Sequence, residues 1–274
     1  MKTTNRALKG ALLATAVAAA LPAAAHAHRA WMLPSATVLS GENVWLTVDA
    51  AAANTLFHFD HRPMGLNNLT VHAPDGSTLE PQNVSQGAYR STFDVDLVQN
   101  GTYNVEVLND SVSAVYTDEN GEEQRFRGTQ ADFAASGLAD RDDVTPSYNT
   151  SRTEFFVTVG APTDMTIQPS GVGLELEPIT HPNDLYAGEA ARFRLLQDGE
   201  PLADQELEVI AGGQRYRDAE DAIPTVSDEN GEFEVTWPEP GMYWIHAEVG
   251  PGGRNPAPGA RSAAYNGTFE VLPQ

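Results

Sequence analysis

Cysteine is missing from this 274-residue chain, and lysine occurs only twice, at Lys2 and Lys9. The missing cysteines exclude disulfide frameworks, iron–sulfur clusters and thiolate zinc sites. Cations are scarce as well, since 16 basic side chains stand against 38 acidic ones, for a formal net charge of −22. This balance excludes sequence-independent nucleic-acid binding, because such binding requires cationic side chains that displace phosphate counterions.

Long hydrophobic runs are also missing, and one short run lies near the start. Three basic residues among the first nine precede an apolar stretch over 11–21, and the ending Ala25-His26-Ala27 follows. The stretch is too short to span a bilayer, and a basic head, an apolar middle and an A-x-A ending are typical of a secretory signal peptide. We predict that residues 1–27 are removed, by cleavage after Ala27 or after Ala25, and that the mature protein is periplasmic.

The predicted mature chain is more acidic than the whole sequence. Removal of residues 1–27 leaves 247 residues with 13 basic and 38 acidic side chains, and every remaining cation is arginine. We interpret this acidity as an adaptation to a salty medium, in which salt screens self-repulsion while carboxylates keep the protein hydrated. Attraction of cations or of a basic partner is the alternative. Because no cysteine follows the signal, we expect no lipid anchor.

Short segments of alternating or β-rich sequence dominate the mature chain. Strands of this length, separated by turn residues, are typical of β-sandwiches, and only 130–138 has a helical pattern. Proline and glycine are dense between 160 and 189, which predicts irregular chain there. We expect an all-β fold with two immunoglobulin-like β-sandwich domains, at 28–160 and 189–274, joined by a linker over 161–188. The predicted strands cover 43–48, 55–59, 89–95, 102–108, 153–159, 190–196, 206–210, 232–237, 242–249 and 263–271.

Two sequence echoes favour related sandwiches in both halves. Gly101-Thr102-Tyr103 and Gly241-Met242-Tyr243 each follow an alternating strand, as in the tyrosine corner of immunoglobulin-like sandwiches, where the hydroxyl binds the preceding loop. The second echo is Asp-Glu-Asn-Gly-Glu, at 118–122 and 228–232. Its Asn-Gly pair predicts hairpins with type I′ turns, because both residues tolerate positive φ. A calcium loop is disfavoured, since the regular ligand spacing is missing.

Histidine is the informative residue type, and its densest cluster is Phe57-His58-Phe59-Asp60-His61. In a strand over 55–60, His58 and Asp60 would point to one face, and His61 would begin the next turn. Imidazoles beside a carboxylate suit nickel, copper, cobalt, zinc or iron, and a site without thiolate depends on them. The structural alternative is a half-buried His58 with Asp60 paired to Arg62.

The predicted cleavage site adds a further ligating group. Cleavage after Ala27 makes His28 the first residue, so that its free amine and imidazole chelate one ion while a second histidine completes a copper-binding brace. Cleavage after Ala25 instead gives His26-Ala27-His28, in which the amine, two amide nitrogens and the last imidazole form a square plane for copper or nickel. Either outcome predicts a metal chelate. The alternative is that Ala-His-Ala is only a permitted signal-peptide ending.

His72, which ends the run 69–72, would approach His58 if their strands pair, although a plain surface position is the alternative. The candidate metal ligands are therefore His28, His58, Asp60, His61 and His72. No Ser-His-Asp order, phosphate-binding loop or pair of catalytic carboxylates stands out from the acidic background.

The run His28-Arg29-Ala30-Trp31-Met32-Leu33-Pro34-Ser35, directly after the signal, resembles the opening of a NikM-like periplasmic family associated with nickel and cobalt uptake. Runs at 174–182, 186–189, 195–203, 225–233 and 240–244 are similar to the second half of that family. The resemblance implies a secreted β-sandwich protein that binds a transition-metal ion and helps to deliver it to a membrane transporter. It implies only His28 as a ligand. Because the chain ends at Gln274 without a membrane segment, we expect a separate transporter.

The preferred hypothesis is a periplasmic accessory protein that binds nickel, cobalt or copper and is not an enzyme. One alternative is a copper enzyme, because His28 with a second histidine would resemble the brace of oxidative polysaccharide-cleaving enzymes. Another is a metal-free carbohydrate-binding or adhesion module, in which exposed Trp31, Tyr89 or Trp244 would form the contact surface.

Overall fold

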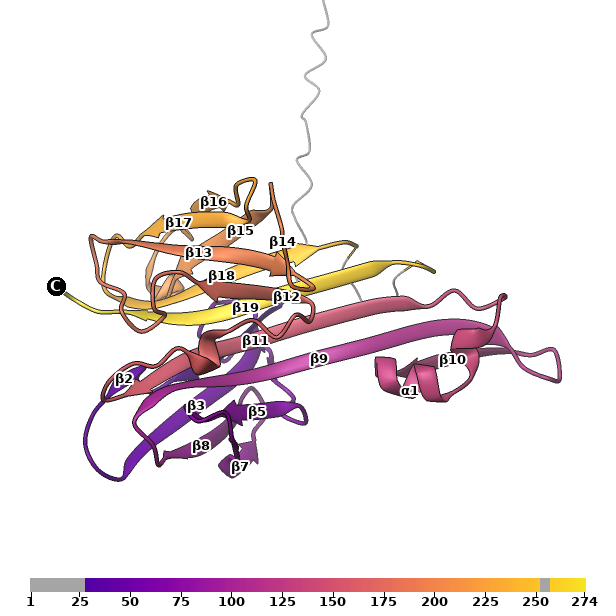
Figure 1. Ribbon diagram of the computed structural model, residues 1–274, viewed down its shortest axis with the longest axis horizontal. Coiled ribbons are helices and arrows are strands. Elements are labelled where there is room, and N and C mark those ends of the chain that lie inside the picture. Colours follow the sequence, from indigo (N-terminus) through magenta and orange to yellow (C-terminus); the bar gives the residue numbers. More distant parts are fainter. Residues whose placement is uncertain (1–27, 252–256) are drawn as a thin grey trace, which may run out of the picture.

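The protein consists of two β-sandwiches that lie against each other (Figure 1). The computed structural model describes residues 28–251 and 257–274, so the predicted signal peptide at 1–27 lies outside the described residues. The all-β, immunoglobulin-like sandwich prediction is confirmed. No helix within the described ranges is long and apolar enough to cross a membrane.

The first sandwich has a small antiparallel sheet on one side. Its strand order is β1-β3-β8-β7, and β4 pairs with the end of β3. The inward positions of β3 and β8 alternate with exposed or half-buried ones, as the sequence pattern predicts, and place Leu46, Val48, Phe93 and Val95 in the core. The strands are β1 (Arg29–Pro34), β3 (Val44–Ala53), β4 (Arg62–Pro63), β7 (Gln82–Gln86) and β8 (Ser91–Leu97).

A ten-stranded sheet runs through both sandwiches. Its order is β16-β15-β18-β19-β11-β9-β5-β6, with β10 beside β9 and β2 beside β11. Its strands are β2 (Val38–Leu39), β5 (Leu69–His72), β6 (Thr78–Leu79), β9 (Gly101–Thr117), β10 (Glu123–Gly128), β11 (Ser147–Val159), β15 (Glu206–Ala211), β16 (Ile223–Val226), β18 (Gly241–Val249) and β19 (Arg261–Val271).

A third sheet closes the second sandwich, with strands β12 (Leu174–Pro178), β13 (Ala190–Gln197), β14 (Glu200–Pro201) and β17 (Glu232–Thr236). Part of the segment expected as a linker belongs to this sheet, because β12 pairs with β13 and buries Leu174 and Leu176. The short helix η2 (Met165–Ile167) also lies in that segment.

The two sandwiches are joined by a parallel strand pair. β11 pairs with β19 over eight positions, from Tyr148 opposite Arg261 to Phe155 opposite Thr268. On its other edge β11 pairs with β9, so one hydrogen-bonded sheet crosses the junction. The side chains of β9 and β11 therefore serve both halves, since successive residues point to opposite faces.

Both predicted tyrosine corners are confirmed. The Tyr103 hydroxyl donates to the Gln99 carbonyl at 2.8 Å and accepts from the Gln99 amide at 2.6 Å. The Tyr243 hydroxyl makes the same pair of bonds with Glu239, at 2.7 and 3.3 Å. The predicted helical segment is also present, as α1 (Gln130–Ala135), which is capped by Thr129, and η1 (Leu138–Asp140).

The type I′ prediction for the two Asn-Gly turns is wrong. Gly121 and Gly231 have positive φ, whereas the preceding asparagines do not. The reason is an aspartate at the start of each turn. Asp118 accepts the amides of residues 120 and 122, and Asp228 those of 230 and 232, which fixes a different turn. The first turn makes the β9–β10 hairpin, but the second connects β16 to β17, which lie in different sheets.

Candidate functional site

The amino-terminal histidine lies beside a second histidine. β1 and β4 pair with opposite edges of β3 near its end, so the residues just before them, His28 and His61, flank the same point. Their ring centroids are 3.5 Å apart, and the rings are inclined by only 4°. Of the five predicted metal ligands, these two are the ones that the fold brings into contact.

The strand predicted over 55–60 is wrong, because these residues form turns between β3 and β4. Phe57 has a φ of 56°, and Asp60 accepts hydrogen bonds from the amides of Asn54 (2.8 Å) and Thr55 (3.0 Å). Partial burial raises the pKa of Asp60, but these bonds outweigh it and leave the pKa below its ordinary value. The carboxylate thus holds the turn and does not share a strand face with His58.

His58 contacts a cation. Its Nε2 lies within hydrogen-bond distance of the Arg215 guanidinium, which comes from the short helix η3 (Gln214–Tyr216) of the second sandwich. The neighbouring Gln214 accepts the Leu56 amide at 2.8 Å, which ties η3 to the turn. A metal ion at the His58 Nε2 position would have to displace Arg215.

Aromatic side chains from β1, from the turn after β3 and from β18 gather at the junction of the sandwiches. Trp31 packs against Phe57 and Phe59, with ring centroids 5.5 and 5.6 Å away, and Trp244 donates its Nε1 hydrogen to the Ala30 carbonyl at 3.1 Å. Both tryptophans are buried, with 0% and 2% exposure. This contradicts the expectation that they are exposed on a contact surface, because their size and apolar rings fill the junction between the sandwiches.

His72 lies elsewhere, on β5 of the ten-stranded sheet, and its Nε2 is 3.1 Å from Oε1 of Glu106 on β9. Within the described part of the chain, no group of three or more histidine, aspartate or glutamate side chains is placed to hold a metal ion. A metal ion at His28 and His61 therefore needs a further ligand that is not a histidine, aspartate or glutamate side chain of the described residues.

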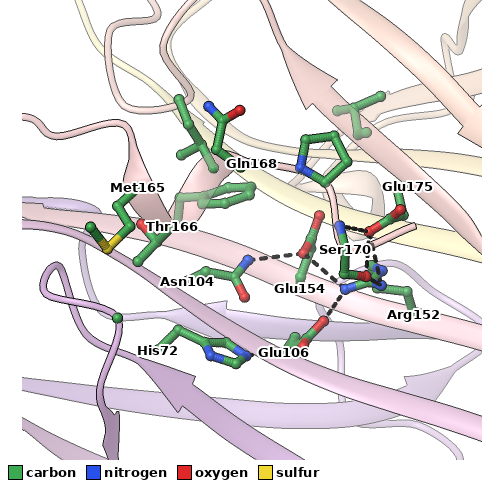
Figure 2. A pocket seen from close by; sticks show the side chains of 15 residues that line it. His72, Asn104, Glu106, Arg152, Glu154, Met165, Thr166, Gln168, Ser170 and Glu175 are labelled. Carbon is green, nitrogen blue, oxygen red and sulfur yellow. Dashed lines mark hydrogen bonds and ion pairs between the residues drawn. The ribbon is translucent and has the colours of Figure 1, made fainter. Parts of the chain in front are cut away.

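His72 belongs to a second site, a pocket of charged side chains at the junction of the sandwiches (Figure 2). Arg152 on β11 is its centre. The guanidinium forms ion pairs with Glu106 and with Glu175 of β12, the latter at 3.1 Å, and it donates to Oγ of Ser170 at 2.9 Å. Glu154, two residues further along β11, lies 4.0 Å from Arg152 and accepts from Asn104 at 2.9 Å.

Burial acts differently on the two facing carboxylates. Burial raises the pKa of Glu106, but the hydrogen bond from His72 and the charge of Arg152 outweigh it, so the pKa is lowered. Burial dominates at Glu154 and raises its pKa, because Arg152 is further away and Glu106 adds a like charge. Burial and the charge of Glu154 likewise raise the pKa of Tyr265 on β19.

Apart from His72, the residues of this second site were not among the predicted ligands. Part of its signal was present, because Glu106 lies between Val105 and Val107 and Glu154 directly precedes the apolar run 155–157. Strands predicted at 102–108 and 153–159 would place these charges in a half-buried sheet. A charged side chain at such a position is unusual unless it is paired.

Comparison with known proteins gives one family and several distant structures. A family model described as "Domain of unknown function (DUF4198)" matches residues 25–250. No curated protein matches the chain. Among solved structures, a marsupial T cell receptor is 12% identical, with 91% of this chain and 73% of that chain covered and a TM-score of 0.24. The human OSCAR ligand-binding domain is 14% identical, with 90% and 100% covered and a TM-score of 0.21. The D0-D1 domain of intimin is 11% identical, with 87% and 96% covered and a TM-score of 0.21.

Proposed function

Since the chain belongs to the DUF4198 family, whose description names no activity, we propose a function from the amino-terminal site: a secreted protein that binds one transition-metal ion at His28 and His61. In this proposal the protein is not an enzyme. It resides in the periplasm and serves as an accessory to a separate membrane transporter for nickel, cobalt or a related ion.

The observation that carries the proposal is the 3.5 Å separation of the His28 and His61 rings. Cleavage after Ala27 adds the α-amine of His28 to the two imidazoles, which gives three nitrogen ligands. Three nitrogens suit copper(II) and nickel(II), which favour planar sets of such donors. The parallel rings do not yet aim at one point, so binding includes rotation of at least one imidazole about its side-chain bonds.

Overall charge supports the attraction of a cation. The chain has a net charge of −22, and its acidic surface raises the local concentration of cations by long-range attraction. Arg215 next to His58 has the opposite local effect and disfavours a cation at His58. We therefore assign His28 and His61 as ligands and leave His58, Asp60 and His72 outside the first coordination sphere.

The test uses the mature protein isolated from periplasm, with its first residue determined by mass spectrometry. Copper, nickel, cobalt and zinc are titrated calorimetrically against a competing chelator. His28→Ala, His61→Ala and an added residue before His28 should each weaken binding by at least about 100-fold, because even outer-shell partners of a metal contribute 10- to 100-fold. His72→Gln, a histidine outside the site, is the matched control and should leave the affinity unchanged.

Two outcomes would overturn this proposal. Tight binding that survives both His28→Ala and His61→Ala would remove the site, and no binding of any of the four metals would remove the function. The same samples test the copper-enzyme alternative, which the histidine pair also favours. Hydrogen peroxide formed from oxygen and ascorbate by the copper-loaded protein, and lost in His28→Ala, would support a redox enzyme instead of an accessory protein.

A further inference from the structure

The second site buries three acidic side chains around one arginine. Glu106 and Glu154 are direct partners across β9 and β11, so their side chains lie on one face of the sheet. Their side chains are 12% and 6% exposed, and that of Glu175, on the covering strand β12, is 5% exposed. Like charges opposite each other destabilise a sheet, and a single arginine faces these three carboxylates.

A cavity of about 190 Å³ adjoins these groups. The sheet contributes one face of the cavity, with His72, Asn104, Glu106 and Glu154 next to Phe156, the strand partner of Asn104, whereas Ile167 comes from the covering helix η2. Figure 2 shows the amide nitrogen of Asn104 directed at Glu154 and its oxygen turned toward the His72 side of the cavity. The mouth is open, because His72 is 35% and Met165 is 59% exposed.

A buried hydroxyl lies behind Glu154. Tyr265 is fully buried, and burial, the charge of Glu154 and a side-chain hydrogen bond with that carboxyl group raise the pKa of its hydroxyl. The ring covers Gly267, the strand partner of Glu154, with the hydroxyl 2.5 Å from where a Cβ would stand. An ionised Glu154 would accept this donor, and a cation in the cavity would favour that ionised form.

We propose that this junction cavity binds a small organic cation, with a primary ammonium group against Glu106 and Glu154 and a short apolar chain against Phe156 and Ile167. Carboxylate and amide oxygens accept hydrogen bonds, so they select an ammonium that carries N–H groups. A quaternary ammonium would require an aromatic cage, and Phe156 is the single aromatic side chain in the lining.

Other ligand classes fit less well. An anion would meet three acidic side chains, and no group of three or more histidine, aspartate or glutamate side chains among the described residues is placed to hold a bare metal ion. The size also fits, since about 190 Å³ equals roughly six waters at about 30 Å³ each. A chain of about four carbons with one ammonium occupies such a volume.

Proton release distinguishes this binding from simple filling of the cavity. Burial raises the pKa of Glu154 above the ordinary value of a carboxyl group. The groups that face it are Glu106 of β9, Arg152 of β11, Glu175 of β12 and Tyr265 of β19, with His72 of β5 beyond Glu106. An entering ammonium stabilises the Glu154 carboxylate and expels its proton, so affinity rises with pH.

The experiment titrates the mature protein with n-butylammonium by calorimetry, in two buffers of different ionisation enthalpy. Tetramethylammonium, 1-butanol and butyrate are compared at constant ionic strength. We expect n-butylammonium alone to bind, with proton release. Glu154→Gln should weaken binding at least about tenfold, as expected for the loss of a hydrogen bond to a charged group, and should abolish proton release. Glu119→Gln, an exposed residue of the β9–β10 turn, is the matched control.

A second variant keeps the test valid if Glu154→Gln fails to fold. Met165 is exposed at the mouth, so Met165→Lys places a tethered ammonium there without changing the core. This ammonium should compete with n-butylammonium and weaken its binding at least about tenfold. Met165→Gln, which adds no charge, should not weaken binding. Equal binding of 1-butanol or tetramethylammonium would overturn the proposal. So would no binding at 10 mM n-butylammonium, or full affinity in Met165→Lys. The metal titrations at His28 are independent of this result.

Discussion

Replacing Arg152 with methionine tests how the junction is held together. Arg152 is 5% exposed, and its guanidinium contacts Glu106, Glu175, Ser170 and the Val172 carbonyl. Methionine keeps most of the apolar volume but leaves buried carboxylates without a cation. Removing one partner of a buried ion pair typically costs about 3–5 kcal/mol of unfolding free energy, because the remaining charge stays buried. At about 2–4 °C per kcal/mol, Arg152→Met should lower the Tm by about 6–20 °C.

The loss should depend on pH. In the wild type the pKa of Glu106 lies below its ordinary 4.5, so its contribution is complete above that pH and is lost as pH falls through the lower folded value. Without Arg152, one of the groups that lower the folded pKa of Glu106 is lost, so this pKa is higher than in the wild type, and protonation relieves the buried charge. The difference between variant and wild type should therefore be largest near neutral pH and should shrink toward pH 4.

Urea and thermal unfolding, followed by circular dichroism between pH 4 and 8, provide the measurement. Arg192→Met is the matched control, because Arg192 pairs with Glu232 at an exposed position and such pairs contribute about 0–1 kcal/mol. A loss below about 1 kcal/mol for Arg152→Met, or a loss that does not change with pH, would refute the reasoning.

Three further predictions concern the same strands. Glu154→Gln should become more stable relative to the wild type as pH rises above 4.5, because a carboxyl group whose pKa is raised in the folded state lowers the free energy of unfolding over that range. Parallel curves of unfolding free energy against pH, measured by urea unfolding, would contradict this. Tyr103→Phe removes both hydrogen bonds to Gln99 and should cost about 1–3 kcal/mol in urea unfolding, so an unchanged midpoint would contradict the corner's role. Gly267→Ala places a Cβ 2.5 Å from the Tyr265 hydroxyl and should cost about 1–3 kcal/mol, and a stabilised variant would show that the ring moves freely.

Local sequence signals predicted the sandwich architecture well. Alternation located most strands, and the spacing of Gly101 and Tyr103 predicted a corner whose two hydrogen bonds form within five residues. Local signals failed where a neighbouring side chain redirected the backbone. Asp60 accepts hydrogen bonds from the amides of Asn54 and Thr55, so a segment with a strand-like sequence forms a loop. Asp118 accepts the amide of Asn120 and changes the Asn-Gly turn in the same way.

Contacts between distant segments could not be predicted from the sequence pattern. The placing of His28 against His61 depends on β1 and β4 flanking β3, which requires the strand order of the sheet. The burial of Trp244 depends on its bond to Ala30 across the junction. The charged pocket needs the register that sets Glu106 opposite Glu154, and a shift of one residue would turn one of them to the other face.

The parallel pairing of β11 with β19 has a consequence for biogenesis. β11 is complete at Val159, but its partner begins only at Arg261, so a chain that emerges in sequence order leaves one edge of β11 open until the late strand arrives. An open strand edge is a template for pairing with other chains. The first half therefore keeps this edge open until the last strand of the second half docks, and a chain truncated before Arg261 should be prone to aggregation.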